Sequence, residues 1–481
     1  MKLDASKKIS QEYFDQIVQE NVNDFEMSEQ EAIDDAINQL KSQNCDLSTI
    51  CKYPKQEQQD LLDSLTKMNT LLTSTPNLTE AQTQNLLDYL KIIKEKFDKD
   101  ISFRCLATRS KTNPSVTQIF VNYLKDSNLK QHDNQIVEAF LNTFQSYITQ
   151  QNDVLNSNDL KLLILLSEES FLGSNQSSLS ALLKLLNSAC LMNESNRQSL
   201  VENGLCENLM KIFTIYKKSD LILCDTCLLI RSLLLDDDLR VEFGHSHEHA
   251  KFIASKLNGL DVLLQAGLSN DNTLSEETLA SIMLTLSKLA VRNEFCQEIC
   301  DKGGLEFVLK CIDEKYLKNI ALLKSALSLL KSICNNDQVR HQATKLNAVE
   351  LVKQVLFKYM PNLQICEMAC AALSPLLLRN VEGSEQLYAC QAHQVLVNIL
   401  AMHSTKPKLV KNCCLALRNS ISRTKEFGEK LLELKIEEIL RPILNQNDPI
   451  CYDEVKSVLR DLGCQVDLKE LWTGSGKNLT Q

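Results

Sequence analysis

The sequence predicts an all-α protein, a right-handed α-solenoid of about eight repeats that follows an acidic N-terminal helical segment. Only 12 glycines and 8 prolines interrupt 481 residues, and this scarcity of turn residues favours long helices. A short break followed by an apolar helix recurs along the chain, which is typical of a repeat protein. Aromatic residues make up 5% of the chain and there is one Trp, so the core must consist of aliphatic residues and cysteine.

The break is clearest at Gly304, which is followed by the apolar helical stretch LEFVLKCI. The central residues of the corresponding breaks are Asp159, Gly204, Gly259, Gly304, Ala348, Ala392 and Lys435. Successive breaks are 45, 55, 45, 44, 44 and 43 residues apart, so one step contains an insertion.

Each period holds two short helical patterns and then a longer one, such as TLASIMLTLSKLA or LVKNCCLALRNSI. Three helices per period of this length are typical of armadillo repeats. No single unit covers its own apolar face, so neighbouring units must stack into a continuous core. We expect an acidic N-terminal helix and tether at residues 1–60, helices leading into the array at 61–113, the armadillo solenoid at 114–464 and a C-terminal tail at 465–481.

The chain is acidic, with a formal net charge of -10, and residues 1–60 hold 13 acidic against 6 basic residues. This balance argues against a general binder of phosphate backbones. The N-terminus resembles no signal peptide and no stretch is long and apolar enough to cross a membrane, so we expect an intracellular protein, cytoplasmic, nuclear or both. Because its charge opposes that of the basic residues described below, the acidic segment is a candidate for self-inhibition.

The 18 cysteines are expected to be reduced and to act as small core residues. Cys296 and Cys300, like Cys366 and Cys370, are four residues apart, which stacks them on one side of a helix. The long step contains HSHEHAKF, where His245, His247 and His249 are read as a solvated insertion loop rather than a metal site. No metal and no cofactor are predicted.

The lead segment also has a recognisable helical pattern. Ser28 and Glu31 have the spacing of a capping box, and Ile33, Ala36 and Leu40 line one stripe of the helix that follows. The stretches ISQEYFDQIVQENVNDFEMSEQEAI, CDLSTI, VRNEFCQEICDKGGL and ALRNSISR together resemble the armadillo repeat-containing protein 6 family. The resemblance covers nearly the whole chain and implies an armadillo solenoid with a protein-binding role, no enzymatic activity and no catalytic residues.

In armadillo arrays generally, the third helices line a concave groove and a repeated Asn binds the backbone of an extended peptide. Aligned third helices place that position at Asn187, Arg231, Lys288, Lys331, Pro375 and Asn419, of which only two are Asn. The position four residues earlier carries Trp in nuclear-import receptors, but here it is Leu183, Cys227, Leu284, Leu327, Ala371 and Leu415. Recognition of basic nuclear-localisation peptides is therefore not expected.

Basic residues replace the Asn ladder. The predicted partner-binding residues are Asn187, Arg231, Lys288, Arg292, Lys331, Arg379, Arg418, Asn419 and Arg423. Arginine there offers paired donors to carboxylate or phosphate groups. The alternative is that these cations only complement the dipoles of helix C-termini.

The pattern predicts a non-catalytic adaptor that binds an extended or helical segment of a protein partner, favouring acidic or phosphorylated partners. The alternative is a nuclear-transport-type carrier or a nucleic-acid-associated adaptor. An enzyme is not expected, because the sequence has no phosphate-binding glycine loop, nucleophile elbow or metal motif. A membrane, a nucleic acid or a small-molecule substrate is likewise not expected as a partner.

Overall fold

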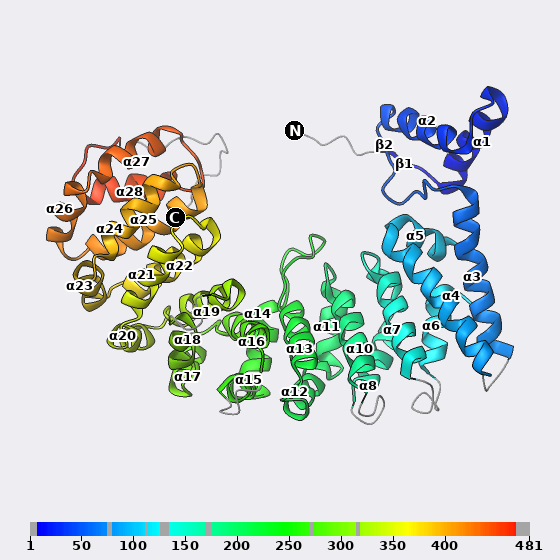
Figure 1. Ribbon diagram of the computed structural model, residues 1–481, viewed down its shortest axis with the longest axis horizontal. Helices are drawn as coiled ribbons and strands as arrows, with labels where there is room; N and C mark the ends of the chain where they lie inside the picture. The colour runs from blue at the N-terminus through cyan, green and yellow to red at the C-terminus, as the bar shows by residue number, and fades with distance from the viewer. Residues whose placement is uncertain are drawn as a thin grey trace. The chain divides into compact units, whose positions relative to one another are not determined.

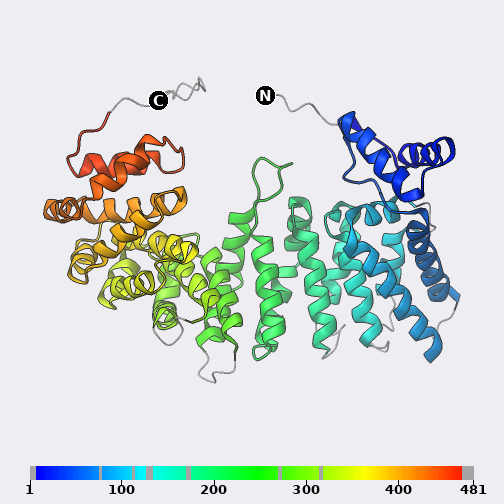
Figure 2. The same cartoon turned by 45° about the horizontal axis from the view of Figure 1, so that its top comes forward.

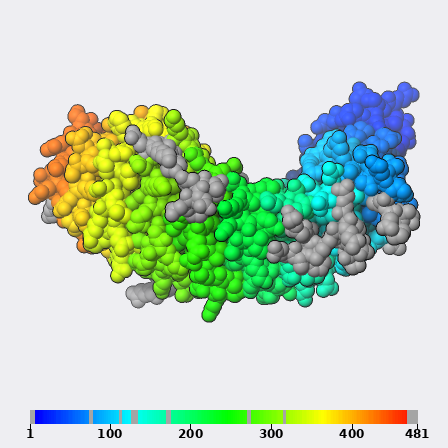
Figure 3. All heavy atoms as spheres, turned by 60° about the horizontal axis from the view of Figure 1, so that its bottom comes forward, coloured from blue at the N-terminus to red at the C-terminus, as the bar shows by residue number. Residues whose placement is uncertain are grey.

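A computed structural model describes residues 7–74, 79–110, 114–125, 134–168, 175–268, 274–313 and 318–467. The chain divides into two compact units, unit 1 (Met1–Phe252) and unit 2 (Ile253–Gln481). Within each unit, successive helices lie side by side in chain order (Figures 1 and 2). The colours on the molecular surface in Figure 3 follow the same order within each unit. The two units are described separately below.

Unit 1 begins with a small module that contains helices α1 (Gln11–Phe25) and α2 (Glu29–Ser42). Ser28 caps α2 and forms the predicted capping box with Glu31, so that prediction is confirmed. Strands β1 (Lys7–Lys8) and β2 (Cys45–Asp46) form a short parallel pair.

This module has its own apolar core, where the sequence analysis expected one helix and a tether. The core is formed by Phe14, Ile17, Val18, Ala32, Ile33, Ala36, Leu40, Leu47 and Ile50. The difference arises because α1 also presents an apolar stripe, so two amphipathic helices cover each other. The domain boundaries predicted at 60, 113 and 464 stay predictions.

Two long helices connect this module to the repeats of unit 1, and α14 ends the unit. The helices after the module are α3 (Lys55–Ser74), α4 (Glu80–Lys99), α5 (Ile101–Arg109), α6 (Val116–Leu124), α7 (Asn134–Ile148), the 3₁₀ turn η2 (Asn152–Val154), α8 (Ser157–Leu166), α10 (Gln176–Cys190), α11 (Glu194–Glu202), α12 (Leu205–Ile215), α13 (Asp220–Leu233) and α14 (Ser246–Lys251). The longer helices α4, α7, α10 and α13 pack on one another in chain order.

Unit 2 continues the triplet pattern after a π-helical segment, η3 (Phe252–Lys256). Its helices are α15 (Gly259–Leu268), α16 (Glu276–Leu289), α17 (Asn293–Asp301), α18 (Gly304–Ile312), α19 (Ile320–Ile333), α20 (Asp337–Lys345), α21 (Ala348–Lys358), α22 (Leu363–Leu377), α23 (Val381–Ala389), α24 (Ala392–Met402), α25 (Pro407–Ile421), α26 (Lys425–Glu433), α27 (Ile436–Asn445) and α28 (Tyr452–Asp461). The third helices α16, α19, α22, α25 and α28 pack in that order. The predicted fold class, an armadillo-type α-solenoid, is confirmed.

The periodic break is a residue in the left-handed region that joins the first helix of a repeat to the second. In unit 2 it is Asn258, Gly303, Asn347, Gln391 and Lys435, with φ between 53° and 86°. The left-handed conformation is easiest for glycine and asparagine, which explains the recurrent Asn and Gly in the sequence. The next residue, Gly304, packs so closely that a Cβ would lie 2.6 Å from the carbonyl oxygen of Ile299. The glycine pair therefore serves the joint between two helices.

Burial agrees with the predicted role of the cysteines. The structure shows all eighteen as thiols, and thirteen of them are buried. Burial raises the pKa of Cys296 and of Cys300 to about 11, so neither thiol ionises readily. Among the helices within the described ranges, none combines the length and apolar character that a bilayer crossing requires.

Candidate functional site

Five of the predicted partner-binding cations lie exposed in unit 2. Each is in or just after the last turn of a third helix: Lys288, Arg292, Lys331, Arg379 and Arg423. None of the five forms an ion pair with another residue in the described part of the chain. They therefore place unneutralised positive charge at the C-terminal ends of successive third helices.

Three other predicted site residues connect neighbouring third helices. The Asn187 side-chain oxygen accepts a hydrogen bond from the Ser232 hydroxyl, and the Asn419 amide donates to the Ser374 carbonyl at 2.8 Å. Arg418 forms an ion pair of 3.0 Å with Asp461. Each of the three side chains thus makes a polar contact between neighbouring repeats.

Arg231 and Pro375 complete the predicted set of positions. Arg231 is half-buried on α13, and burial lowers the pKa of its guanidinium. Pro375 is buried inside α22. Neither resembles the exposed cations described above.

Further polar contacts tie the third helices of unit 2 together. The hydroxyl groups of Ser328 and Ser287 are 3.3 Å apart, joining α19 to α16. Asn412 donates to the Glu367 carbonyl at 3.2 Å, which joins α25 to α22. Lys411 pairs with Glu454 at 3.1 Å, which joins α25 to α28. These contacts fix the register of the third helices and so the spacing of the exposed cations.

A hollow of about 920 Å³ lies beside this face, between the first helices α17 and α20. Its lining includes four acidic side chains and two basic ones: Glu294, Glu298, Asp301, Asp337, Lys302 and Arg379. Arg379 thus borders carboxylates, and its backbone is in the left-handed region with φ 53°. Its surroundings differ from those of Lys288 and Lys331.

An arginine at the fourth position of the first helix was missed by the sequence reasoning. It occurs in three repeats, as Arg104, Arg197 and Arg340, and its guanidinium bridges two third-helix ends. Arg104 donates to the carbonyls of Phe97 and Thr149, both at 2.7 Å. Arg340 donates to the carbonyls of Cys334 at 3.2 Å and Leu378 at 2.6 Å. An alignment of the first helices, ISFR, ESNR and DQVR, would have revealed this position.

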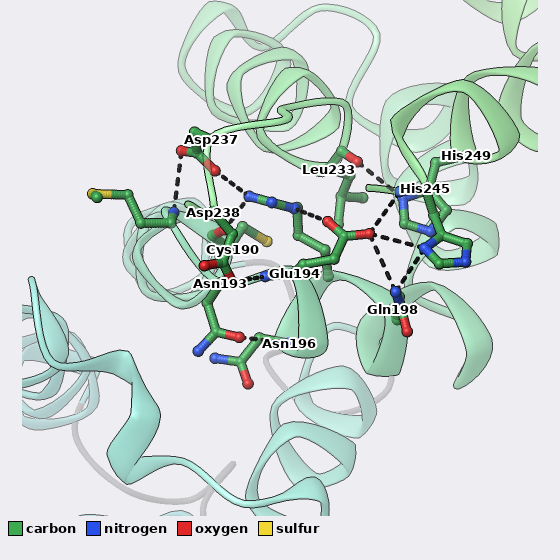
Figure 4. A network of polar contacts seen from close by, with 12 residues as sticks. Cys190, Asn193, Glu194, Asn196, Gln198, Leu233, Asp237, Asp238, His245 and His249 are labelled. Carbon is green, nitrogen blue, oxygen red and sulfur yellow. Dashed lines mark hydrogen bonds and ion pairs between the residues drawn. The ribbon is translucent and has the colours of Figure 1, made fainter. Parts of the chain in front are cut away.

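Arg197 lies in the most elaborate of these networks (Figure 4). Its side chain is 1% exposed and donates to the Cys190 carbonyl at 2.8 Å. It also pairs with Glu194 at 2.8 Å and with Asp237 at 2.5 Å. Asp237 in turn accepts a hydrogen bond from the backbone of Met192 at 3.1 Å. The guanidinium therefore ties the end of α10 to the segment that follows α13.

Arg240 forms a second ion-pair group close to the first. It makes two hydrogen bonds of 2.9 Å to the carboxylate of Asp153 and one of 2.8 Å to Asp238. Asp238 accepts a further hydrogen bond of 2.9 Å from the backbone of Glu194, at the start of α11. The hydrogen bond from Arg240 lowers the pKa of Asp238 well below its ordinary value.

The histidines of the insertion are arranged differently from the predicted loop. His245 and His247 are exposed, but His249 is buried in α14, where its Nδ1 lies 3.0 Å from the Leu233 carbonyl oxygen. His245 Nδ1 lies 3.2 Å from Glu194. The prediction of a solvated loop is wrong for His249, because α14 turns this ring towards the end of α13. Within the described residues, no cluster of three or more His, Cys, Asp or Glu side chains has a geometry suited to a metal ion.

Opposing effects act on the pKa values of the buried pair Arg197 and Glu194. Burial by itself lowers the pKa of Arg197, but hydrogen bonds to Asp237 and Glu194 outweigh it and raise that pKa. Burial likewise raises the pKa of Glu194, yet hydrogen bonds from His245, Arg197 and Gln198 lower it overall. Both groups are thus held in their charged forms, which suits a structural joint.

Comparison with known proteins matches this architecture. A family model described as ARMC6 matches residues 57–481, and the model of the Armadillo repeat-containing protein 6 N-terminal domain matches residues 6–65. Armadillo repeat-containing protein 6 of Homo sapiens is 31% identical over 99% of this chain and 94% of its own length. The Drosophila melanogaster homolog is 28% identical over 98% of this chain and 99% of its own.

Among solved structures, an engineered protein aligns with a TM-score of 0.52 and 17% identity, covering 83% of this chain and 99% of its own. That likeness concerns the fold alone. The two family models and the human relative concern the whole length of the sequence. The chain belongs to the armadillo repeat-containing protein 6 family.

Proposed function

We propose that the protein is a non-catalytic adaptor that binds a segment of a partner protein on the third-helix face of unit 2. The cations Lys288, Arg292, Lys331 and Arg423 would contact acidic or phosphorylated residues of that segment. The observation that supports this is that all four are exposed at the ends of α16, α19 and α25 and form no ion pair with any residue that the structure describes, in a chain whose formal net charge is -10.

The chemistry of these groups favours anionic partners. Guanidinium groups offer two parallel donors to a carboxylate or phosphate, and ammonium groups add point charges. An extended segment advances about 3.3 Å per residue, so it could meet several repeats in turn. Arg418 and Asn419 would contribute indirectly, since their side chains set the spacing of the third helices of unit 2.

The test is a triple charge reversal, Lys288→Glu, Lys331→Glu and Arg423→Glu. Arg379 is left unchanged because it borders the acidic hollow. The probes are fluorescent peptides of equal length, one rich in Glu, one carrying phosphoserine and one neutral, with binding measured by fluorescence anisotropy. We expect the affinity for the two acidic probes to fall at least about 10-fold, and the loss to shrink at high salt.

The matched control reverses three exposed lysines that lie away from the third helices, Lys310→Glu, Lys345→Glu and Lys358→Glu. Both triple variants change the net charge equally, so a general electrostatic effect would weaken both alike. Equal losses in the two variants, or no binding of any acidic probe to the unmodified protein, would contradict the proposal. Selective binding of single-stranded RNA or DNA would instead favour the nucleic-acid adaptor.

A further inference from the structure

One junction between repeats is unlike the others. In five junctions the third helix is separated from the next first helix by three residues, at 191–193, 290–292, 334–336, 378–380 and 422–424. After α13 the separation is twelve residues, 234–245, which we call the α13–α14 loop. It projects beyond the ends of the neighbouring helices of unit 1 (Figures 1 and 2). An insertion in an otherwise regular array is a common location for function.

The α13–α14 loop exposes large apolar side chains to solvent. Leu239 is 93% exposed, Phe243 is 77% exposed and Val241 is 39% exposed. Leu191 and Met192, in the junction before α11, are exposed as well. The loop touches this second segment, because Arg240 donates to the Met192 carbonyl at 3.0 Å. Apolar surface grouped in this way is typical of an interaction site.

The exposure does not result from a loosely held loop. On one side of Leu239, Asp237 pairs with Arg197 and Asp238 accepts a hydrogen bond from the Glu194 backbone (Figure 4). On the other side, Arg240 pairs with Asp153. Gly244 lies so close to Asp236 that a Cβ there would be 2.6 Å from its carboxylate oxygen. Polar contacts thus hold the backbone while the side chains of Leu239 and Phe243 remain largely exposed to solvent. Such pre-organisation lowers the entropy cost of binding.

The charges around these apolar residues indicate the kind of partner. Asp236 and Glu242 are exposed and form no ion pair with any other described residue. Four acidic residues and one arginine lie between Leu235 and Gly244, so the loop carries a formal charge of -3. Charges at the rim of an interface select partners of opposite sign. An anionic membrane would be repelled by the same charges.

We propose that the α13–α14 loop is a docking element that inserts Leu239 and Phe243 into an apolar pocket rimmed by Lys or Arg on a partner protein. Asp236 and Glu242 pair with that basic rim. The Arg197 and Arg240 networks act as positioning groups that hold the loop for binding. This site lies wholly in unit 1 and does not depend on the cation surface of unit 2.

The test uses the full-length chain with the photo-crosslinking amino acid p-benzoylphenylalanine at position 243. The cross-linked protein is identified by mass spectrometry, purified and titrated against three variants of the full chain. These are Leu239→Ser with Phe243→Ser, Asp236→Asn with Glu242→Gln, and a control at two exposed apolar residues of other helices, Leu165→Ser with Ile215→Ser. We expect the apolar double variant to lose at least 10-fold in affinity and the charge variant to lose its salt dependence.

The control variant should bind within twofold of the unmodified chain. All three variants should keep their melting temperature to within about 2 °C, since the altered side chains are exposed. The proposal is overturned if no protein is cross-linked, or if the only product is a second copy of this chain. It is also overturned if the purified partner binds the Leu239 and Phe243 variant within twofold of the unmodified chain, or if lipid vesicles replace the partner.

Discussion

The junction around Arg197 in unit 1 and the junction around Cys296 in unit 2 both fill the space between two third-helix ends, but with different chemistry. Both residues occupy the fourth position of a first helix, in α11 and α17. Arg197 donates to the carbonyl at the end of α10 and pairs with Asp237 after α13. Cys296 Sγ lies 3.8 Å from the Ala290 carbonyl oxygen and 3.5 Å from that of Ser332. A thiol is a weak donor, so it fills the position without organising anything further.

The difference shows what a buried charge adds to a repeat. Carboxylates stabilise a buried guanidinium, and Glu194 and Asp237 both pair with Arg197. Those carboxylates also fix the α13–α14 loop, which the short junctions lack. At Cys296 no additional acid is needed, and the junction after α19, whose end Cys296 contacts, has only three residues. An ion network in one repeat can therefore support a new surface feature without changing the stacking.

Replacing Arg197 with Met should have the largest effect. It leaves Glu194, 2% exposed, as a buried carboxylate without its cation, and breaking a buried pair in this way costs about 3–5 kcal/mol. Urea unfolding of the full chain, with hydrogen exchange to locate the loss, should show α10, α11 and the α13–α14 loop exchanging early. Arg441→Met, which removes an exposed pair with Glu437, is the control and should leave the urea midpoint nearly unchanged.

Replacing Glu194 with Gln tests the pH dependence of the same network. The pKa of Glu194 is lowered from its ordinary 4.5, so its carboxylate stabilises the fold above that pH and the contribution is lost as the pH falls through the folded-state pKa. At pH 7 the variant should be less stable by about 2 kcal/mol, the scale of hydrogen bonds to charged groups. Denaturant midpoints measured from pH 7 to pH 3 should converge for the two proteins. A constant difference over that range would contradict this assignment.

Replacing Arg340 with Met should cost less than the change at Arg197. Its carboxylate partner, Asp337, is 75% exposed and returns to water, so the loss falls on the carbonyls that Arg340 leaves without its donors, those of Cys334, Asn335 and Leu378. Leaving buried carbonyls unsatisfied costs about 1–3 kcal/mol. The same urea unfolding experiment measures this loss of stability. Hydrogen exchange is expected to become faster at the ends of α19 and α22. A loss as large as that of Arg197→Met would mean that charge burial does not distinguish the two junctions.

Much of the fold was predictable because it depends on local spacing. Repeated Asn and Gly mark left-handed residues such as Asn347 and Gly303, and the apolar periods between them mark the helices. The core role of Cys296 and Cys300 also followed from spacing and is confirmed by their burial. These features recur within one repeat, so one sequence is enough to read them.

The polar joints were not predictable in the same way. Arg240 contacts Asp153, 87 residues earlier, and no pattern within a repeat relates the two. Arg418 and Asn419 were expected to face a partner, but their bonds to Asp461 and Ser374 depend on how adjacent third helices align. The sequence was compatible with exposed side chains at Lys288 and Lys331. Which charged residues form ion pairs could be determined only from the packed structure. That these lysines bind a partner stays a prediction.

Replacing Cys296 with Ala should have the smallest effect, and its size decides what the thiol contributes. Cys296 is buried and its Sγ contacts two carbonyl oxygens only weakly, so the loss should be about 1 kcal/mol, mostly from lost packing. Cys296→Ser, which keeps a donor of similar size, is the matched variant. If hydrogen bonding to the Ala290 and Ser332 carbonyls matters more than packing, serine will be more stable than alanine in urea. If the serine variant is less stable than the alanine variant, the position favours an apolar side chain. Cys296 then resembles the arginines of the other joints only in its position in the first helix.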